Sequence, residues 1–166
     1  MQKEQLKNSI PLIPFFRPSL GQEEKEAVSA VLDSGWLSSG RYVEEFEGAF
    51  RDYLRVPFAR AVHSATSGLH LSLKCAGVEQ GTGVITTPYT YISTAEAIGY
   101  LGARPIFVDI DPNTLNLNTD LVDRVLEKAR NHSELPEISA LLPVHFAGRI
   151  CPMREIMELC EAYSVP

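Results

Sequence analysis

The spacing of apolar residues changes near residue 58, and this change divides the chain into two parts. In the first part, apolar residues recur every three or four positions in "QEEKEAVSAVLDSG" and "RYVEEFEGAFRDYL", as on one face of a helix. Acidic residues open the first segment and Gly35 follows it, which is typical of helix ends. Both segments are predicted to be surface helices, with apolar faces formed by Ala27, Val28, Val31 and Leu32 and by Val43, Phe46, Phe50 and Tyr53.

After Phe58, short apolar runs alternate with helical patterns. The runs predict strands near Ala59–His63, Val84–Thr87, Pro105–Asp109 and Ala140–Val144. The helical patterns lie near Ser67–Ala76, Ile92–Tyr100, Thr119–Arg130 and Met153–Tyr163. Apolar strands separated by crossover helices predict an α/β fold with a mostly parallel sheet covered on both faces. Ligands of such sheets bind at the carboxyl ends of the strands.

The same pattern predicts one incomplete domain over residues 1–166. Residues 1–57 would hold an N-terminal arm and the two surface helices. The arm contains "IPLIPFFRPSLG", which is rich in proline and is predicted to be extended. Residues 58–166 would hold the first four strands and their helices. The last helix is followed by "SVP" where the alternation calls for another strand, so we expect the first half of a larger domain.

Composition narrows the classes of partner. The 166 residues are 45% hydrophobic and 22% charged, which suits a globular domain with a real core. A net charge of −6 without a basic cluster argues against nucleic acid as the main partner. No apolar run has the length of a signal peptide core or a membrane span, so we expect a cytoplasmic protein with no membrane partner. The three cysteines lack CxxC spacing and are expected to be reduced, partly buried thiols.

Two groups of residues at predicted strand ends could bind a ligand. The turn "SATSG" lies between a predicted strand and a predicted helix, where free N–H groups and the helix dipole favour an anion. The alternative is an ordinary helix cap, because serine and threonine are favoured there. Tyr89 and Tyr91 follow the second strand and could stack on a ring or belong to the core.

Two further groups follow the third and fourth strands. Asp109 and Asp111 in "DIDPNTLNLN" could form a metal pair, but an Asp-rich turn that bonds its own backbone is the favoured interpretation. His145 in "PVHFAG" is interpreted as a structural hydrogen-bonding residue in preference to a catalyst. The four histidines of the chain show no metal-ligand spacing, and no metal site is predicted.

Several segments together resemble one protein family. These are "FFRPSLGQEEKEAV", "SGWLSSGRYVEEFE", "SATSGLHLSLKCAGV", "ITTPYTYISTAEAIGYLGARPIFVDIDPNTLNLN" and "PVHFAGRICPMREIMELC". In order and spacing they resemble the DegT/StrS family of nucleotide-sugar aminotransferases, which use pyridoxal phosphate. The resemblance covers nearly the whole chain. It implies the N-terminal half of the large domain of a fold type I pyridoxal phosphate-dependent transferase.

The resemblance implies a role for the turn and for one aromatic residue. The N–H groups of Thr66 and Ser67 and the Thr66 hydroxyl would hold the cofactor phosphate, and Gly68 would leave room for its approach. Tyr91 matches the position whose ring stacks on the pyridine, where the family usually has Trp or Phe.

The resemblance also implies substrate contacts and partners. Trp36 and Ser39 correspond to a loop near the substrate and the dimer partner. His145 lies near the site as a substrate contact, without a proton-transfer role. The whole enzyme would be a homo-oligomer acting on a nucleotide sugar and an amino donor, in surface-polysaccharide or deoxyamino-sugar biosynthesis. The amino group, taken from glutamate, would pass to the keto-sugar.

The resemblance also implies that two groups the reaction needs lie on strands that this chain does not reach, namely the lysine that binds the cofactor and the acid that faces the pyridine nitrogen. Lys74 near the turn is predicted to be a surface lysine. No catalytic residue is assigned. The isolated chain is expected to be inactive and to bind pyridoxal phosphate weakly or not at all. A further departure is "GTGV" where the family commonly reads "GDEV"; Thr82 and Gly83 are predicted to lie in a surface turn.

Three alternatives stay open at this stage. The first is a non-catalytic interaction or regulatory protein that retains the family's dimer surface. The second is part of a pyridoxal phosphate-dependent sugar dehydratase, in which histidine replaces the lysine. The third is an unrelated nucleotide-binding α/β domain.

Overall fold

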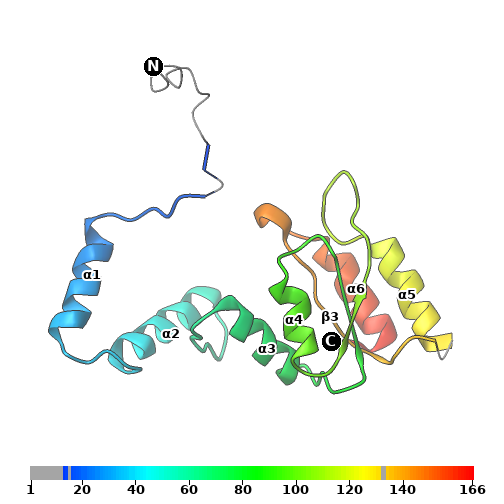
Figure 1. Ribbon diagram of the computed structural model, residues 1–166, viewed down its shortest axis with the longest axis horizontal. Helices are drawn as coiled ribbons and strands as arrows, with labels where there is room; N and C mark the ends of the chain where they lie inside the picture. The colour runs from blue at the N-terminus through cyan, green and yellow to red at the C-terminus, as the bar shows by residue number, and fades with distance from the viewer. Residues whose placement is uncertain (1–12, 15, 132–133) are drawn as a thin grey trace, which may run out of the picture. The chain divides into compact units, whose positions relative to one another are not determined.

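The computed structural model describes residues 13–14, 16–131 and 134–166, and the chain divides into the units Met1–Ala61 and Val62–Pro166. In the first unit, α1 (Gln22–Asp33) and α2 (Arg41–Leu54) occupy the two segments predicted to be helical (Figure 1). Residues 16–21 form neither helix nor strand, in keeping with the predicted arm. The rest of that prediction, at residues 10–12 and 15, lies outside the described residues.

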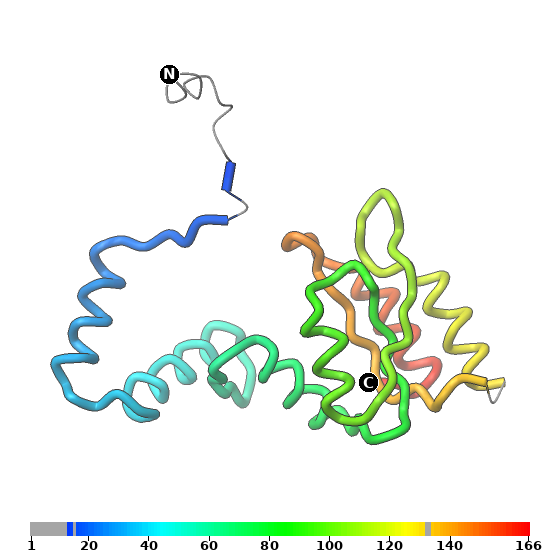
Figure 2. Tube along the Cα trace, viewed as in Figure 1, coloured from blue at the N-terminus to red at the C-terminus, as the bar shows by residue number. Residues whose placement is uncertain are grey.

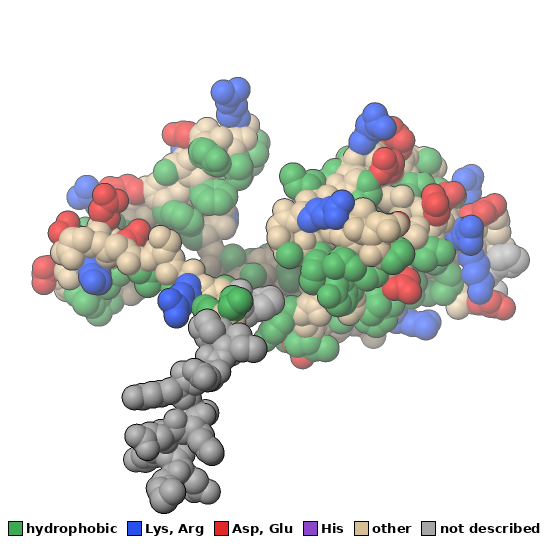
Figure 3. All heavy atoms as spheres, turned by 90° about the horizontal axis from the view of Figure 1, so that it is seen from above, with side chains coloured by type: hydrophobic (Ala, Val, Ile, Leu, Met, Phe, Trp, Pro, Cys, Tyr) green, Lys and Arg blue, Asp and Glu red, His purple; other side chains and the backbone are tan. Residues whose placement is uncertain are grey.

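The two helices of the first unit carry their apolar faces on the surface. Neither α1 nor α2 contains a buried residue. Val28 and Leu32 on α1 are each 60% exposed. On α2, Phe46 and Phe50 are 56% and 48% exposed, and their ring centroids lie 5.5 Å apart. Figure 3 shows hydrophobic side chains at the surface. The prediction of surface helices is confirmed.

The second unit is a three-layer α/β structure (Figures 1 and 2). Its sheet has the order β2-β1-β3, and both strand pairs are parallel. The strands are β1 (Gly83–Thr86), β2 (Arg104–Phe107) and β3 (Ile138–Leu141). The helices are α3 (Ala65–Cys75), α4 (Ser93–Gly99), α5 (Thr119–Asn131) and α6 (Met153–Tyr163), with a short 3₁₀ turn η1 (Phe146–Gly148) after β3.

Alternating strand residues build one core on each face of the sheet. Val84 and Ala140 face α3 and α4, where they pack with Leu73 and Ile98. The neighbouring strand residues turn to the other face and pack against α5 and α6; that second core includes Ile85, Leu141, Val122, Leu126, Ile156 and Cys160. The predicted parallel sheet with helices on both faces is therefore confirmed.

The strand predicted at Ala59–His63 is wrong, since this segment is irregular in the structure. No strand of the described residues pairs with it, and the Val62 side chain is 43% exposed. The carboxylate of Glu47 binds this segment instead, accepting the backbone N–H of Ala61 at 2.9 Å and a side-chain Nη1–H of Arg60 at 2.8 Å. An apolar run without a partner strand does not become a strand.

Gly83 is buried at the start of β1, so the prediction of a surface turn is wrong for this residue. A Cβ built on Gly83 would lie 2.9 Å from Cγ of Pro136 and 3.0 Å from Cδ1 of Ile138. The Thr82 hydroxyl donates to the carbonyl of Glu79 at 2.8 Å and accepts from Ser139 Oγ at 2.8 Å. The sequence "TG" at this point therefore suits close packing between β1 and β3.

Two other predictions can be compared with the structure. In the part of the chain that it describes, no helix combines the length and the apolar character needed to cross a membrane. Of the three thiols, Cys151 and Cys160 are buried and Cys75 is exposed. Burial raises the pKa of the Cys151 and Cys160 thiols, which keeps both protonated at neutral pH.

Candidate functional site

The start of α3 leaves two backbone N–H groups available to a ligand. Ser64 is the N-cap, and its hydroxyl accepts the Ser67 N–H at 3.2 Å, while its carbonyl accepts the Gly68 N–H at 3.1 Å. Among the described residues, the N–H groups of Ala65 and Thr66 have no partner. The first turn is thus both an ordinary cap and a site with two free donors at the positive end of a helix dipole.

This geometry changes the part played by individual turn residues. The Ser67 N–H belongs to the cap, whereas the Ala65 N–H, which the sequence did not single out, has no partner among the residues that the structure describes. The Ser67 hydroxyl lies 3.0 Å from Ser64 Oγ and 3.0 Å from Nε2 of His63. A Cβ on Gly68 would meet only Val62 Cγ2, at an ordinary 3.5 Å, so packing within the chain does not require glycine there.

The segment after β1 holds two tyrosines in different surroundings. Tyr89 packs on Phe146, with ring centroids 4.5 Å apart and planes inclined by 31°. Tyr91 is 77% exposed and has no aromatic partner among the residues described. The first ring joins the segment after β1 to the loop after β3, and the second has its faces available to a planar ligand.

Two hydrogen bonds join the beginning and the end of the loop after β3 to each other. Nδ1 of His145 accepts the Cys151 N–H at 3.2 Å, and the Cys151 thiol donates to the carbonyl of Val144 at 3.1 Å. His145 itself is exposed. It lies four residues beyond the last residue of β3, at the carboxyl edge of the sheet where ligands of parallel sheets bind.

Asn116, in the segment after β2, binds the loop after β3 through its side chain. The sequence did not reveal this role. Its side chain is only 1% exposed. Nδ2 donates to the carbonyls of Arg149 and Ile150 at 3.2 and 3.0 Å, and Oδ1 accepts the Phe146 N–H at 3.2 Å. Within "NTLNLN" nothing distinguishes this asparagine from its neighbours, because its partners lie thirty or more residues away.

The aspartates after β2 form the predicted turn. Oδ1 of Asp111 accepts the N–H groups of Asn113 and Thr114 at 2.8 and 2.9 Å. These backbone bonds, that of Thr114 foremost, hold the pKa of the Asp111 carboxyl below its usual range. Oδ1 of Asp109 accepts the Ile110 N–H at 2.8 Å. Both carboxylates thus accept hydrogen bonds from nearby backbone N–H groups, as the favoured interpretation predicted.

In the first unit, the structure brings Trp36 and Ser39 together. The indole Nε1 donates to the carbonyl of Ser39 at 2.9 Å. Both residues line a groove of about 740 Å³ between the end of α1 and the start of α2. A Cβ on Gly40 would lie 2.6 Å from the indole nitrogen, so glycine at this position allows the ring to fold back over the turn.

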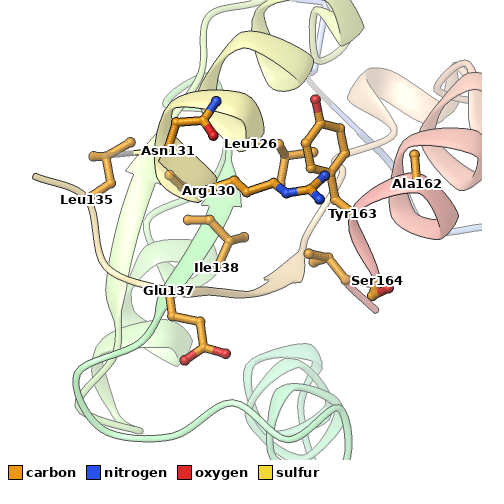
Figure 4. A pocket seen from close by; sticks show the side chains of 11 residues that line it. Leu126, Arg130, Asn131, Leu135, Glu137, Ile138, Ala162, Tyr163 and Ser164 are labelled. Atoms are coloured by element: carbon orange, nitrogen blue, oxygen red, sulfur yellow. The ribbon is translucent and has the colours of Figure 1, made fainter. Parts of the chain in front are cut away.

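A second groove, of about 700 Å³, lies beside the amino end of β3 (Figure 4). His145 follows the carboxyl end of the same strand, so the groove is at the opposite edge of the sheet. Leu126, Arg130, Ile138 and Tyr163 line it, from the C-terminal halves of α5 and α6 and the amino end of β3. None of the predicted site residues lines this groove. It is therefore separate from the carboxyl-edge site.

Comparison with known proteins identifies the family. The family model described as the DegT/DnrJ/EryC1/StrS aminotransferase family matches residues 18–166, nearly the whole chain. The chain belongs to this family. Its parallel sheet and helices correspond to the N-terminal portion of the family's fold, as the sequence resemblance implied.

Three similar proteins illustrate the relationship. An uncharacterized protein of Methanocaldococcus jannaschii is 37% identical over 153 residues, which are 92% of this chain and 38% of that protein. The pyridoxal phosphate form of a candidate sugar aminotransferase from Streptococcus pneumoniae has a TM-score of 0.79 at 29% identity, covering 90% of this chain and 36% of that one. 3-Amino-5-hydroxybenzoic acid synthase has a TM-score of 0.80 at 30% identity, covering 95% and 39%. The chain thus spans less than half of the length of these relatives.

The DegT family uses pyridoxal phosphate, and the residues present fit part of that cofactor. The free N–H groups of Ala65 and Thr66 suit a phosphate, and the exposed ring of Tyr91 suits a pyridine face. Lys74 is exposed in the last turn of α3, as predicted for a surface lysine.

Proposed function

We propose that this chain supplies the phosphate and ring contacts of a pyridoxal phosphate-dependent aminotransferase. The amino group would pass from glutamate to a keto-sugar nucleotide, in surface-polysaccharide or deoxyamino-sugar biosynthesis. The observation that carries the proposal is the pair of free N–H groups at the start of α3, in a chain of this family. A phosphate dianion is the ligand that such a helix start favours most.

The phosphate site in this proposal consists of backbone and one hydroxyl. The N–H groups of Ala65 and Thr66 and the Thr66 hydroxyl donate to the phosphate oxygens. Ser67 acts indirectly, because its N–H is bonded to the Ser64 hydroxyl and fixes the first turn. Gly68 leaves the outer side of the turn open, although no contact within the chain demands glycine there.

Tyr91 would stack on the ring of the cofactor and exclude water from one face. Tyr89 would hold the segment in place through its contact with Phe146. When bound, the cofactor supplies an electron sink that eases loss of a proton next to the reacting nitrogen. His145, at the same edge of the sheet, would bind the substrate, as would Trp36 and Ser39 in the assembled enzyme.

The proposal includes inactivity of the isolated chain. Lys74 is exposed and lies at the end of α3 away from the free N–H groups. It therefore cannot serve as the cofactor-binding lysine of this site, and no transamination is expected without further residues. Homodimer formation and a cytoplasmic location belong to the same proposal.

A second candidate function is favoured by the surface of the first unit. The apolar faces of α1 and α2 are exposed, which suits a protein that acts by pairing with another copy or with a longer relative. Mixing the chain with a full-length homologue tests this function. Formation of a stable mixed complex without cofactor binding by this chain would favour it over the first proposal.

The similar proteins differ in the acceptor substrate that their names indicate. The family and the Streptococcus pneumoniae structure favour a sugar, whereas the similar 3-amino-5-hydroxybenzoic acid synthase is named for a product that is not a nucleotide sugar. Competition between pyridoxal phosphate and UDP-glucose for the chain would show whether a nucleotide sugar binds.

Equilibrium dialysis with pyridoxal phosphate tests the cofactor part. We expect weak binding that Thr66→Ala reduces about tenfold, since a charge-assisted hydrogen bond contributes about 1.5 kcal/mol or more. Ser72→Ala, an exposed position on the same helix, is the matched control and should bind normally. Equal binding by both variants would contradict the phosphate site. Borohydride reduction followed by intact mass should give no adduct at one specific lysine; a single adduct on Lys74 would contradict the claim of inactivity.

A further inference from the structure

We infer that His145 is held as a neutral hydrogen-bond donor, with its proton on Nε2, and that it offers this N–H to an oxygen acceptor of a ligand at the carboxyl edge of the sheet. The ligand part rests on the proposed function. The tautomer part rests only on contacts within this chain.

The tautomer follows from the chemistry of one hydrogen bond. The backbone N–H of Cys151 lies 3.2 Å from Nδ1 of His145, and a backbone N–H can only donate. Nδ1 must therefore carry a lone pair in this conformation. A neutral imidazole has one protonated nitrogen, so the proton is on Nε2. Protonation of Nδ1 would break the bond.

Asn116 keeps the donor and the acceptor of that bond together. Its Nδ2 binds the carbonyls of Arg149 and Ile150, the two residues before Cys151. Its Oδ1 binds the N–H of Phe146, the residue after His145. Because carbonyls only accept and a backbone N–H only donates, the amide cannot be turned around without losing these bonds.

The backbone of the loop is also constrained beyond Asn116. Leu115 and Ala147 have positive φ angles of 61° and 49° although neither is glycine. They adjoin the two residues joined by the Asn116–Phe146 bond. Such conformations persist only where surrounding contacts fix them, so the loop has one defined shape.

The donor faces solvent at an edge where ligands bind. His145 is exposed, and no partner of Nε2 is found among the residues that the structure describes. Phe146 packs on Tyr89, which lies two residues from Tyr91. The free N–H therefore lies on the same loop cluster as the exposed tyrosine ring, and it suits a phosphate, carboxylate or phenolate oxygen. The cofactor and the substrate both contain such groups.

Long-range ¹H–¹⁵N correlation of the ¹⁵N-histidine-labelled chain tests the tautomer directly. At about pH 8, His145 should show an unprotonated Nδ1, which accepts the Cys151 N–H, and a protonated Nε2. Resonances are assigned by comparison with His145→Gln. A proton on Nδ1, or an averaged mixture of tautomers, would overturn the inference.

A pair of asparagine variants tests the positioning role of Asn116. Asn116→Ala should convert His145 to an averaged mixture of tautomers, whereas Asn118→Ala should leave it unchanged. An unchanged tautomer in folded Asn116→Ala would show that this asparagine does not position His145. If Asn116→Ala does not fold, the measurement on the unaltered chain decides the tautomer alone.

Ligand titrations distinguish the source of the acceptor. Pyridoxal phosphate and UDP-glucose are added in separate experiments while His145 Nε2 and the Thr66 amide are observed. A shift of Nε2 with either compound supports the donor role and identifies the source, and a shift with neither overturns it. A Thr66 response without the Nε2–H tautomer means that the inference fails and the cofactor site stands. The Nε2–H tautomer without any Thr66 response means that the cofactor site fails and the tautomer assignment stands.

Discussion

The side-chain oxygen of Asn116 accepts the backbone N–H of Phe146 at 3.2 Å, across thirty residues of sequence. Nδ2 of the same side chain donates to two backbone carbonyls of the loop after β3. One buried side chain therefore satisfies three backbone groups. Buried polar groups that lose their partners destabilise a fold more than an average hydrogen bond stabilises it. The carboxyl-edge loops therefore depend on this residue for their shape.

Asn116→Ala should destabilise the chain by about 2–4 kcal/mol, since it leaves these backbone groups without a partner. Asn118 provides a control, because its Oδ1 accepts a single N–H, that of Leu121 at the start of α5. Asn118→Ala should cost about 1 kcal/mol, the usual cost of a lost helix cap. Urea denaturation of both variants measures the difference. Equal losses would show that the Asn116 contacts contribute no more than a cap.

Gly83→Ala should destabilise the chain by about 1–3 kcal/mol, because its Cβ would crowd Pro136 and Ile138 between the strands. Gly99, in the last turn of α4, is the matched control, because a Cβ added there would have no neighbouring atom within 4 Å. Gly99→Ala should be neutral or stabilising by up to about 1 kcal/mol, since alanine favours a helix more than glycine does. Thermal unfolding should separate the two variants, and a neutral Gly83→Ala would contradict the packing described for β1.

Gly40→Ala should displace the indole of Trp36, because the new Cβ would lie 2.6 Å from its Nε1. Trp36 is the only tryptophan of the chain, so its fluorescence reports on this turn alone. The emission spectrum should change in Gly40→Ala. It should not change in Gly48→Ala, where the Cβ would make only an ordinary contact of 3.8 Å with Arg51. An unaltered spectrum in both variants would mean that the indole does not fold over Gly40.

Asp111 should make stability depend on pH in the acid range. The Asn113 and Thr114 N–H groups favour its charged form, so its pKa is lower in the folded chain than in the unfolded one. Its contribution is therefore fully present above the ordinary aspartate pKa of about 3.9 and is lost as pH falls through the lower folded value. Asp111→Asn should flatten the stability curve below about pH 4. The measurement is urea denaturation at several pH values, with Asp120→Asn as control, and an unchanged curve in Asp111→Asn would refute the assignment.

Local pattern was sufficient for most elements of this fold. The helix periodicity of "RYVEEFEGAFRDYL" and of residues 153–163 gave the bounds of α2 and α6 as observed. The apolar run at Ala59–His63 gave a wrong strand prediction. Strand formation requires a partner strand, which a local apolar pattern does not reveal.

The candidate site was only partly accessible from sequence. The turn at Thr66 and the ring of Tyr91 were found from residue type and family resemblance, and whether they bind the cofactor stays a prediction. The free Ala65 N–H escaped notice because a backbone donor has no signature in its side chain. Asn116 and the His145–Cys151 bond escaped because both depend on how loops meet in space.

The amide resonance of Thr66 provides the most direct test of the central claim, that the start of α3 binds the phosphate of pyridoxal phosphate. The ¹⁵N-labelled chain is titrated with pyridoxal phosphate and, separately, with pyridoxal, which lacks the phosphate. The account predicts saturable shifts of the Thr66 and Ala65 amides with pyridoxal phosphate and none with pyridoxal. Equal responses to both compounds, or no response of these two amides, would contradict it.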